Sequence, residues 1–191
     1  MEARTSVDFP IRVDYIPDEA LGLPEGSGAL GMTFAPGMKD LGWDRDMKTD
    51  MQHLREYWKT DALVSLIEGH EYGLYGMEDY AEEAEAAGIA VEEFPIVDVN
   101  VPRKEQVEEY ADLVGRIIGF LREGRNTVVH CRGGIGRTGT VAASVLVGLG
   151  HDAEDAIRIV RESRSPRMLE APSQEEYVRE FSKRYRGRWS G

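Results

Sequence analysis

The chain has 191 residues, of which 41% are hydrophobic and 30% are charged, and its formal net charge is −12. This length suits one domain that buries a sizeable core without disulfides, and the negative charge argues against nucleic acids and anionic membrane surfaces as partners. No stretch approaches the roughly 20 apolar residues that span a bilayer, and the first twenty residues lack the basic and apolar segments of a secretory signal.

The first half of the chain shows alternating strand and helix patterns. Residues 1–28 are assigned to an N-terminal extension or edge segment, and residues 17–37 are rich in Gly and Pro, which predicts loops around a short strand. Short apolar runs predict strands, and apolar residues at helical spacing predict helices. In chain order we expect a strand at 29–34, a helix at 46–58, a strand at 61–68, a helix at 78–87 and a strand at 89–99.

The second half of the chain is mainly helical. Its predicted elements are a helix at 104–122, a strand at 126–130, and helices at 138–150, 152–164 and 173–186. Ser173 is expected to cap the last helix, with Glu176 three residues later. Strands that alternate with helices indicate a single α/β domain over residues 29–186, with a central, largely parallel sheet flanked by helices and a tail at 187–191.

The chain contains one cysteine, Cys131, and four scattered histidines. A single cysteine cannot form an internal disulfide, and the histidines lack the spacing of a zinc site. We therefore expect a cytoplasmic protein that needs neither a metal nor another cofactor.

Cys131 directly precedes a glycine-rich turn in the stretch TVVHCRGGIGRTGT, which runs from residue 127 to residue 140. A strand, a glycine turn and a helix together gather backbone amides around an anion. The glycines at 134, 136 and 139 also spell a dinucleotide-binding fingerprint. That fingerprint requires an acidic residue about 20 positions further on, at the end of a second strand. Helices follow instead, so the dinucleotide interpretation fails.

The same loop suits a phosphate ester and a nucleophilic sulfur. The guanidinium of Arg137 can bind two phosphate oxygens in a planar fork, which a lysine could not do. The electric field that holds an oxyanion also favours an ionised Cys131, and Thr138 is placed to donate a hydrogen bond to the sulfur. The loop thus offers a nucleophile, a phosphate cradle and a charge clamp.

The motif His130-Cys131, five residues, Arg137-Thr138 resembles the signature of cysteine-dependent protein tyrosine and dual-specificity phosphatases. Residues 35–54 and 94–102 are similar to segments of the kinase-associated, cyclin-dependent-kinase-inhibitor type of dual-specificity phosphatase. The resemblance extends from about residue 30 to residue 181, and it implies a protein-tyrosine-phosphatase-like fold.

The resemblance also assigns roles to further residues. The segment Pro-Ile-x-Asp-x-x-x-Pro carries the general acid of the family, which makes Asp98 the candidate acid, and Asp112 receives no role. In the family, the position of His130 helps to organise the loop and to keep the thiol ionised, and Gln174 falls where related enzymes place a glutamine near the hydrolytic water. The residues that bind phosphate, mainly through backbone amides, are Arg132, Gly133, Gly134, Ile135, Gly136 and Arg137. Lys39 and Arg45 are expected at the rim of the pocket.

These features predict a metal-independent phosphomonoesterase that removes phosphate from tyrosine, serine or threonine in proteins through a phosphocysteine intermediate. An alternative is a phosphatase of small molecules or inositol phosphates with the same mechanism. A non-catalytic phosphate-binding module is a third class, but such proteins typically lose the cysteine, the arginine or the acid. We expect a phosphoprotein substrate and no nucleic acid or membrane partner; the sequence does not support a kinase partner.

Overall fold

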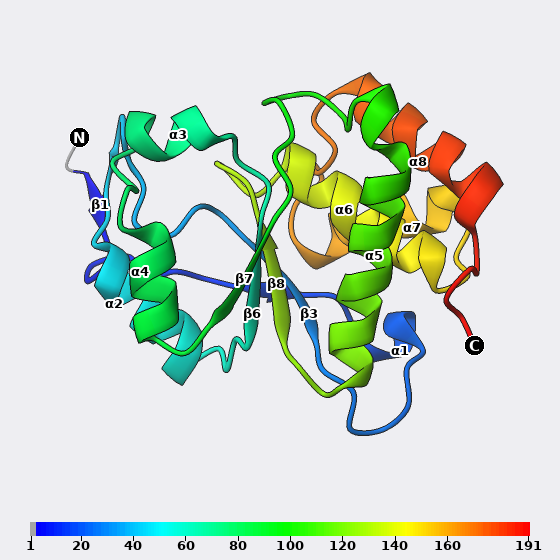
Figure 1. Ribbon diagram of the computed structural model, residues 1–191, viewed down its shortest axis with the longest axis horizontal. Coiled ribbons are helices and arrows are strands. Elements are labelled where there is room, and N and C mark those ends of the chain that lie inside the picture. The colour runs from blue at the N-terminus through cyan, green and yellow to red at the C-terminus, as the bar shows by residue number, and fades with distance from the viewer. Residues whose placement is uncertain (1–2) are drawn as a thin grey trace.

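The computed structural model describes residues 3–191 and places a five-stranded sheet between two groups of helices (Figure 1). The strand order is β2-β3-β8-β6-β7. Four strands are parallel, and β2 joins one edge in the antiparallel direction. The strands are β2 (Asp14–Tyr15), β3 (Leu30–Thr33), β8 (Thr127–His130), β6 (Ala62–Ser65) and β7 (Ala90–Glu93). The predicted α/β fold with a largely parallel sheet is confirmed.

Helices cover both sides of this sheet (Figure 1). One side carries α2 (Met47–Glu56), α3 (Gly69–Leu74) and α4 (Tyr80–Ala86). The other side carries α1 (Asp18–Leu21), the 3-10 turn η1 (Lys104–Gln106), α5 (Val107–Arg122), α6 (Gly136–Gly148), α7 (Ala153–Ser163) and α8 (Pro172–Tyr185). A small second sheet joins β1 (Arg4–Thr5), β5 (Trp43–Asp44) and β4 (Lys39–Asp40).

The register of the central strands brings their carboxyl ends to one edge of the sheet. His130 at the end of β8 lies opposite Thr33 of β3 on one side and Ser65 of β6 on the other. Every residue of β8 is buried, as expected for a β-branched strand at the centre of a parallel sheet. The loops that follow these strands therefore meet at the edge where α/β proteins bind their ligands.

Helix α6 starts directly after the loop that follows β8, and all of its residues are buried. This agrees with the apolar pattern, although the helix begins at Gly136, two residues earlier than the sequence indicates. In the described part of the chain α7 and α8 follow α6 without another strand. The structure therefore lacks the second strand that the dinucleotide interpretation requires.

The predicted cap of α8 is wrong. The N-cap residue is Ala171 rather than Ser173, and Pro172 is the first helical residue. Proline favours this position, because its φ angle suits the first turn and its missing N–H is not needed there. The side chain of Gln174 accepts the Ala171 amide at 3.2 Å, which is the contact expected from Glu176 in a helix starting two residues later.

The N-terminal segment folds onto the domain and does not extend away from it. Residues 14–15 form the edge strand β2, and residues 4–5 pair with β5 in the small sheet. Arg45 anchors this segment, since its Nη1 donates to the carbonyl of Phe9 at 2.9 Å. Residues 1 and 2 of the predicted extension lie outside the described residues.

Candidate active site

The loop from Cys131 to Ile135 connects β8 to α6 and forms the floor of the site. Four of its residues, Arg132, Gly133, Gly134 and Ile135, have amides that no backbone carbonyl accepts within residues 3–191. Free amides before a helix N-terminus are the groups that bind phosphate in proteins. Cys131 is 3% exposed and stands at the start of this loop. The floor thus combines a sulfur with a set of unpaired N–H donors.

Gly134 is required by the shape of this loop. Its φ angle is 67°, in the left-handed region that glycine adopts without strain. A Cβ atom here would lie 2.1 Å from the carbonyl oxygen of Thr33. Any larger residue would therefore push the loop away from β3.

Arg137 is buried beneath the loop and held by several groups. Its two Nη atoms donate to the two carboxylate oxygens of Glu71 at 2.7 and 3.0 Å. Nη1 also donates to the carbonyl of Ile96 at 3.0 Å, and Nη2 lies 2.9 Å from Oδ1 of Asp98. Burial opposes the charge of this guanidinium, but the Glu71 hydrogen bonds and the neighbouring acidic groups outweigh burial and raise the pKa of Arg137. Arg137 is therefore a fixed cation.

Glu71 comes from α3, a helix that the sequence analysis missed. Its Oε2 accepts the amide of Glu68 at 2.7 Å, which caps the helix start. Burial raises the pKa of Glu71, but the hydrogen bonds from Arg137 and Glu68 and the charge of Arg137 together lower it below its usual range. The spacing of Glu68 and Glu71, directly after a buried strand, was the one signal that could have indicated this cap.

Two buried donors next to the loop have no partner. They are Nε of Arg137 and the hydroxyl of Thr138. The hydrogen bond expected from Thr138 to the sulfur is therefore absent. Unpaired buried donors cost stability, so their presence at one site points to an anionic ligand.

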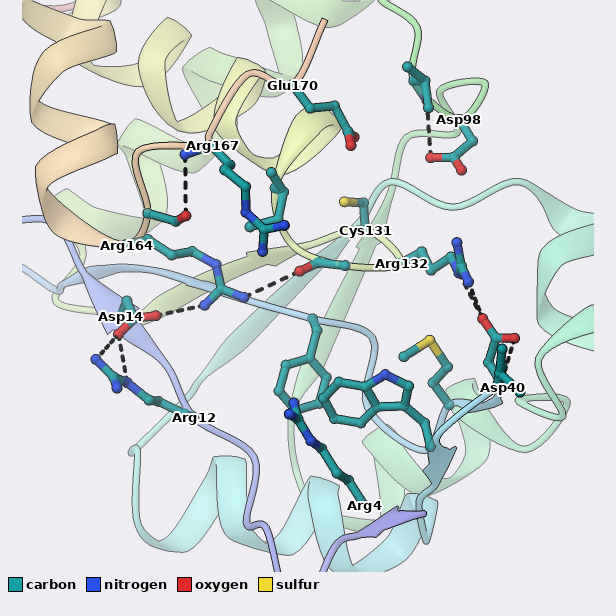
Figure 2. A pocket seen from close by; sticks show the side chains of 18 of the residues that line it. Arg4, Arg12, Asp14, Asp40, Asp98, Cys131, Arg132, Arg164, Arg167 and Glu170 are labelled. Carbon is teal, nitrogen blue, oxygen red and sulfur yellow. Dashed lines mark hydrogen bonds and ion pairs between the residues drawn. The ribbon is translucent and has the colours of Figure 1, made fainter. Parts of the chain in front are cut away.

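Asp98 lies at the mouth of the site, on the loop after β7 (Figure 2). Its side chain is 45% exposed, and its Oδ1 accepts the Val99 amide at 3.0 Å in addition to pairing with Arg137. Val99 has a φ angle of 57°, so the chain turns sharply directly after Asp98. The structure thus brings this carboxylate to the arginine of the signature motif, as the sequence predicts for a residue acting at the same site. Asp112, which received no role, is exposed on α5.

Gln174 is buried and reaches the same site from α8. Its Nε2 donates to the carbonyl of Asn100 at 3.2 Å, which ties α8 to the loop of Asp98. The same Nε2 would lie 2.8 Å from a Cβ atom at Gly136, so the amide group sits directly against the phosphate-binding loop.

His130 supports the loop as a neutral ring. Its Nδ1 lies 3.2 Å from the Cys131 carbonyl, and its Nε2 lies 2.7 Å from the hydroxyl of Tyr80. A carbonyl can only accept, so Nδ1 carries the proton and Tyr80 donates to Nε2. Burial lowers the pKa of His130 to about 4. His130 therefore fixes the backbone of Cys131 and supplies no positive charge to the sulfur at neutral pH.

The pocket above Cys131 has a volume of about 730 Å³. Arginines, acidic residues and aromatic residues line it together, and several come from the N-terminal segment (Figure 2). Arg132 pairs with Asp40 at its rim. Arg45, expected at the rim, is instead buried and forms a two-point ion pair with Asp50, because it anchors the N-terminal segment. Lys39 is exposed and does not line the pocket.

A family model described as "Polymorphic toxin system, DSP-PTPase phosphatase" matches residues 36–151, more than half of the chain. Cyclin-dependent kinase inhibitor 3 from rat and from human are each 26% identical over 174 residues, covering 90% of this chain and 79% of theirs.

Two solved structures share the fold. One is kinase-associated phosphatase with its catalytic-site cysteine replaced by serine; the TM-score is 0.84 at 22% identity, covering 92% of this chain and 96% of that chain. The other is Tk-PTP in its active form, with a TM-score of 0.67 at 27% identity, covering 83% and 95%. The resemblance found in the sequence is confirmed, and the chain belongs to the DSP-PTPase family of cysteine-dependent protein phosphatases.

Proposed function

We propose that this protein is a cytoplasmic phosphatase of phosphoproteins that works through a phosphocysteine intermediate. The observation that carries this proposal is the group of unpaired donors around one sulfur: four loop amides, Nε of Arg137 and the Thr138 hydroxyl. A tetrahedral phosphate dianion offers oxygen acceptors on all sides, so it can satisfy these donors together. The acidic chain and its single cysteine support the cytoplasmic location.

In the first step the Cys131 thiolate attacks phosphorus, a sulfur–phosphorus bond forms, and the ester bond to the substrate oxygen breaks. Arg137 and the loop amides stabilise the charge on the equatorial oxygens. Asp98 in its protonated form gives its proton to the departing oxygen. Phosphate binding to Nη2 of Arg137 would compete with the Asp98 carboxylate now paired there, which would free Asp98 to face the leaving group.

In the second step a water molecule attacks phosphorus and the sulfur–phosphorus bond breaks, which releases phosphate and restores the thiolate. Asp98, now ionised, accepts the proton of the water. Gln174 lies against Gly136 and next to the Asp98 loop, a position from which its amide can orient that water.

The substrate class follows from the family and its relatives. One relative is named for inhibition of a cyclin-dependent kinase and one similar structure for association with a kinase; these properties belong to those proteins. We carry over only the phosphoprotein substrate.

None of the helices in residues 3–191 has the length and apolar character needed to cross a membrane.

Inositol phosphates are the alternative substrate. A structure of PTPMT1 in complex with PI(5)P shares the fold with a TM-score of 0.64 at 20% identity. The loop of the present chain contains no lysine between Cys131 and Arg137, and one arginine there is already paired with Asp40. This composition favours a phosphorylated protein side chain over a polyphosphate.

The test is hydrolysis of p-nitrophenyl phosphate, phosphotyrosine and phosphothreonine peptides, and inositol phosphates. Cys131→Ser should abolish turnover of all of them and still bind tungstate, since the cradle is intact. Asp98→Asn should slow turnover by about 10²–10⁴-fold, whereas Asp112→Asn on exposed α5 serves as the matched control with unchanged rates. Activity in Cys131→Ser equal to that of the wild type would exclude the covalent route.

A further inference from the structure

We propose that the N-terminal edge strand takes part in catalysis through Asp14, which orients Arg164 so that Arg164 holds the phosphate-binding loop in its working shape. Asp14 and Arg164 are positioning residues in this proposal, which rests on the proposed function of the loop. Both lie outside residues 36–151, the part of the chain that the family model matches.

Arg164 binds the outer side of the loop. It caps the C-terminal end of α7, and its Nε donates to the carbonyl of Gly134 at 2.7 Å. Its Nη2 lies 3.4 Å from the carbonyl of Gly133, and Figure 2 shows the guanidinium between Asp14 and the loop. One planar side chain thus holds two consecutive carbonyl groups.

These two contacts fix the direction of the loop amides. A trans peptide unit is planar, with its C=O and N–H groups pointing in opposite directions. When the carbonyls of Gly133 and Gly134 point outward to Arg164, the amides of Gly134 and Ile135 must point inward. Those two amides belong to the set that finds no backbone acceptor. Arg164 therefore keeps them available for a phosphate oxygen.

Asp14 fixes Arg164 in turn. Its Oδ2 accepts from Nη1 of Arg164 at 2.7 Å, and the same Nη1 donates to the carbonyl of Met32 at 3.2 Å. The side chains of Asp14 and Arg164 are each only 10% exposed, so the pair is largely shielded from water. Burial lowers the pKa of Arg164, and the charge of Asp14 opposes that effect. Removing the carboxylate would leave a mostly buried cation with carbonyl partners alone.

The pairing of β2 with β3 places Asp14 within hydrogen-bond distance of Arg164. In the antiparallel pair of β2 and β3, Asp14 lies opposite Met32, next to Thr33 at the carboxyl end of β3. The carbonyl of Thr33 is the group against which Gly134 packs. Loop, β3, β2 and the end of α7 are thus joined in one network by Arg164.

The experiment measures tungstate affinity and catalytic rate in Asp14→Asn and Arg164→Lys. Asn keeps the size of Asp but removes the charge. Lys keeps the charge of Arg but lacks the planar guanidinium that donates to two carbonyls and a carboxylate at once. We expect tungstate Kd to rise about tenfold in Asp14→Asn and more in Arg164→Lys, a tenfold change being about 1.4 kcal/mol. The kcat/KM for p-nitrophenyl phosphate should fall in parallel, with most of the loss in kcat.

Glu154→Gln is the matched control, because it removes an exposed ion pair with Arg179 between α7 and α8, and neither residue lines the pocket. It should change neither tungstate affinity nor rate. Asp14→Glu, which restores the charge, should recover part of the loss. If Asp14→Asn and Arg164→Lys lower only the free energy of unfolding and bind tungstate like the wild type, the positioning role is wrong.

Two further results keep the proposal separate from folding and from function. In the wild-type protein, tungstate should shift the NMR resonances of the Gly134 amide and the Arg164 Nε–H together, and an unmoved Arg164 signal contradicts the proposal even if both variants fail to fold. Absence of hydrolysis by the wild type would overturn the proposed function, whereas equal tungstate affinity in wild type and variants would overturn this inference alone.

Discussion

At the scale of single residues, His130 illustrates how burial decides the role of an ionisable group. The ring is fully buried between the Cys131 backbone and the Tyr80 hydroxyl. Desolvation outweighs the hydrogen bond from Nδ1 to the Cys131 carbonyl and lowers the pKa to about 4. His130 therefore adds no positive charge beside Cys131, and the cations whose charges interact with that residue are Arg137 and Arg164.

This pKa predicts a loss of stability in weak acid. The unfolded chain binds a proton at His130 with a pKa near 6.5 and the folded protein only near 4, so the contribution of His130 is complete above pH 6.5 and lost as pH falls toward 4. The shift corresponds to about 3 kcal/mol of unfolding free energy. Urea unfolding of the wild type between pH 7.5 and 4.5 should show this slope, and His130→Asn should lack that part of it. Equal slopes in the two proteins would contradict the buried neutral ring.

At the scale of elements, α3 places the carboxylate of Glu71 against the guanidinium of Arg137. The helix has six residues and includes two glycines, a length and composition with little intrinsic helical stability. Its capping contact at Glu68 and the two-point ion pair with Arg137 hold it in place. Helix α3 and Arg137 at the start of α6 therefore stabilise each other.

We predict that Glu71→Gln lowers both stability and turnover. Arg137 would keep its burial and lose the carboxylate that balances its charge, and breaking such a buried pair costs about 3–5 kcal/mol. The free guanidinium should also lose its fixed orientation, so kcat should fall more than KM rises. Urea unfolding and steady-state kinetics measure the two effects. Glu78→Gln, in an exposed position shortly after α3, should behave like the wild type.

The elements differ in how well the amino-acid sequence predicts them. Strand β8 and helix α6 were recognisable because their residues are buried on all sides, which leaves a continuous apolar pattern. Helix α3 was not, because its stability comes from Arg137, 66 residues away. Cys131, Arg137 and Asp98 carry a motif with fixed spacing. Asp14 and Arg164 are 150 residues apart and no local pattern connects them.

At the scale of the whole molecule, the charge distribution opposes the net charge. The chain carries a formal charge of −12, yet five arginines line the pocket above Cys131. They are Arg4, Arg12, Arg132, Arg164 and Arg167. Four acidic residues, Asp14, Asp40, Asp98 and Glu170, line the same pocket, and two of them pair with Arg12, Arg132 and Arg164. The pocket is therefore much less negative than the chain as a whole, so an anionic substrate meets the weakest repulsion there.

Among the pocket arginines, Arg4 and Arg167 form no ion pair within residues 3–191, and the guanidinium of Arg4 stacks on Phe9 and Trp43. Arg167 is therefore the arginine best placed to act on substrate from this rim, and Figure 2 shows its side chain at the pocket. We predict that Arg167→Ala raises KM about threefold for a phosphopeptide with acidic flanking residues, which is the effect of one exposed charge. KM for p-nitrophenyl phosphate should change little. Kinetics with matched acidic and neutral peptides at low and high salt test this, and equal effects on both peptides would contradict it.

The unpaired donors around the cysteine have a consequence for handling the protein. A fold that leaves Nε of Arg137, the Thr138 hydroxyl and several amides unsatisfied gains stability whenever an oxyanion occupies the loop. At an anion concentration one hundred times Kd the gain is about 2.7 kcal/mol, and the melting temperature should rise by about 5–10 °C. The choice of buffer, phosphate or sulfate against chloride, should thus be visible in a thermal melt, even for a variant that performs no chemistry. If the melting temperature is the same in phosphate, sulfate and chloride, these donors are satisfied by water and the phosphate-binding loop is not preformed.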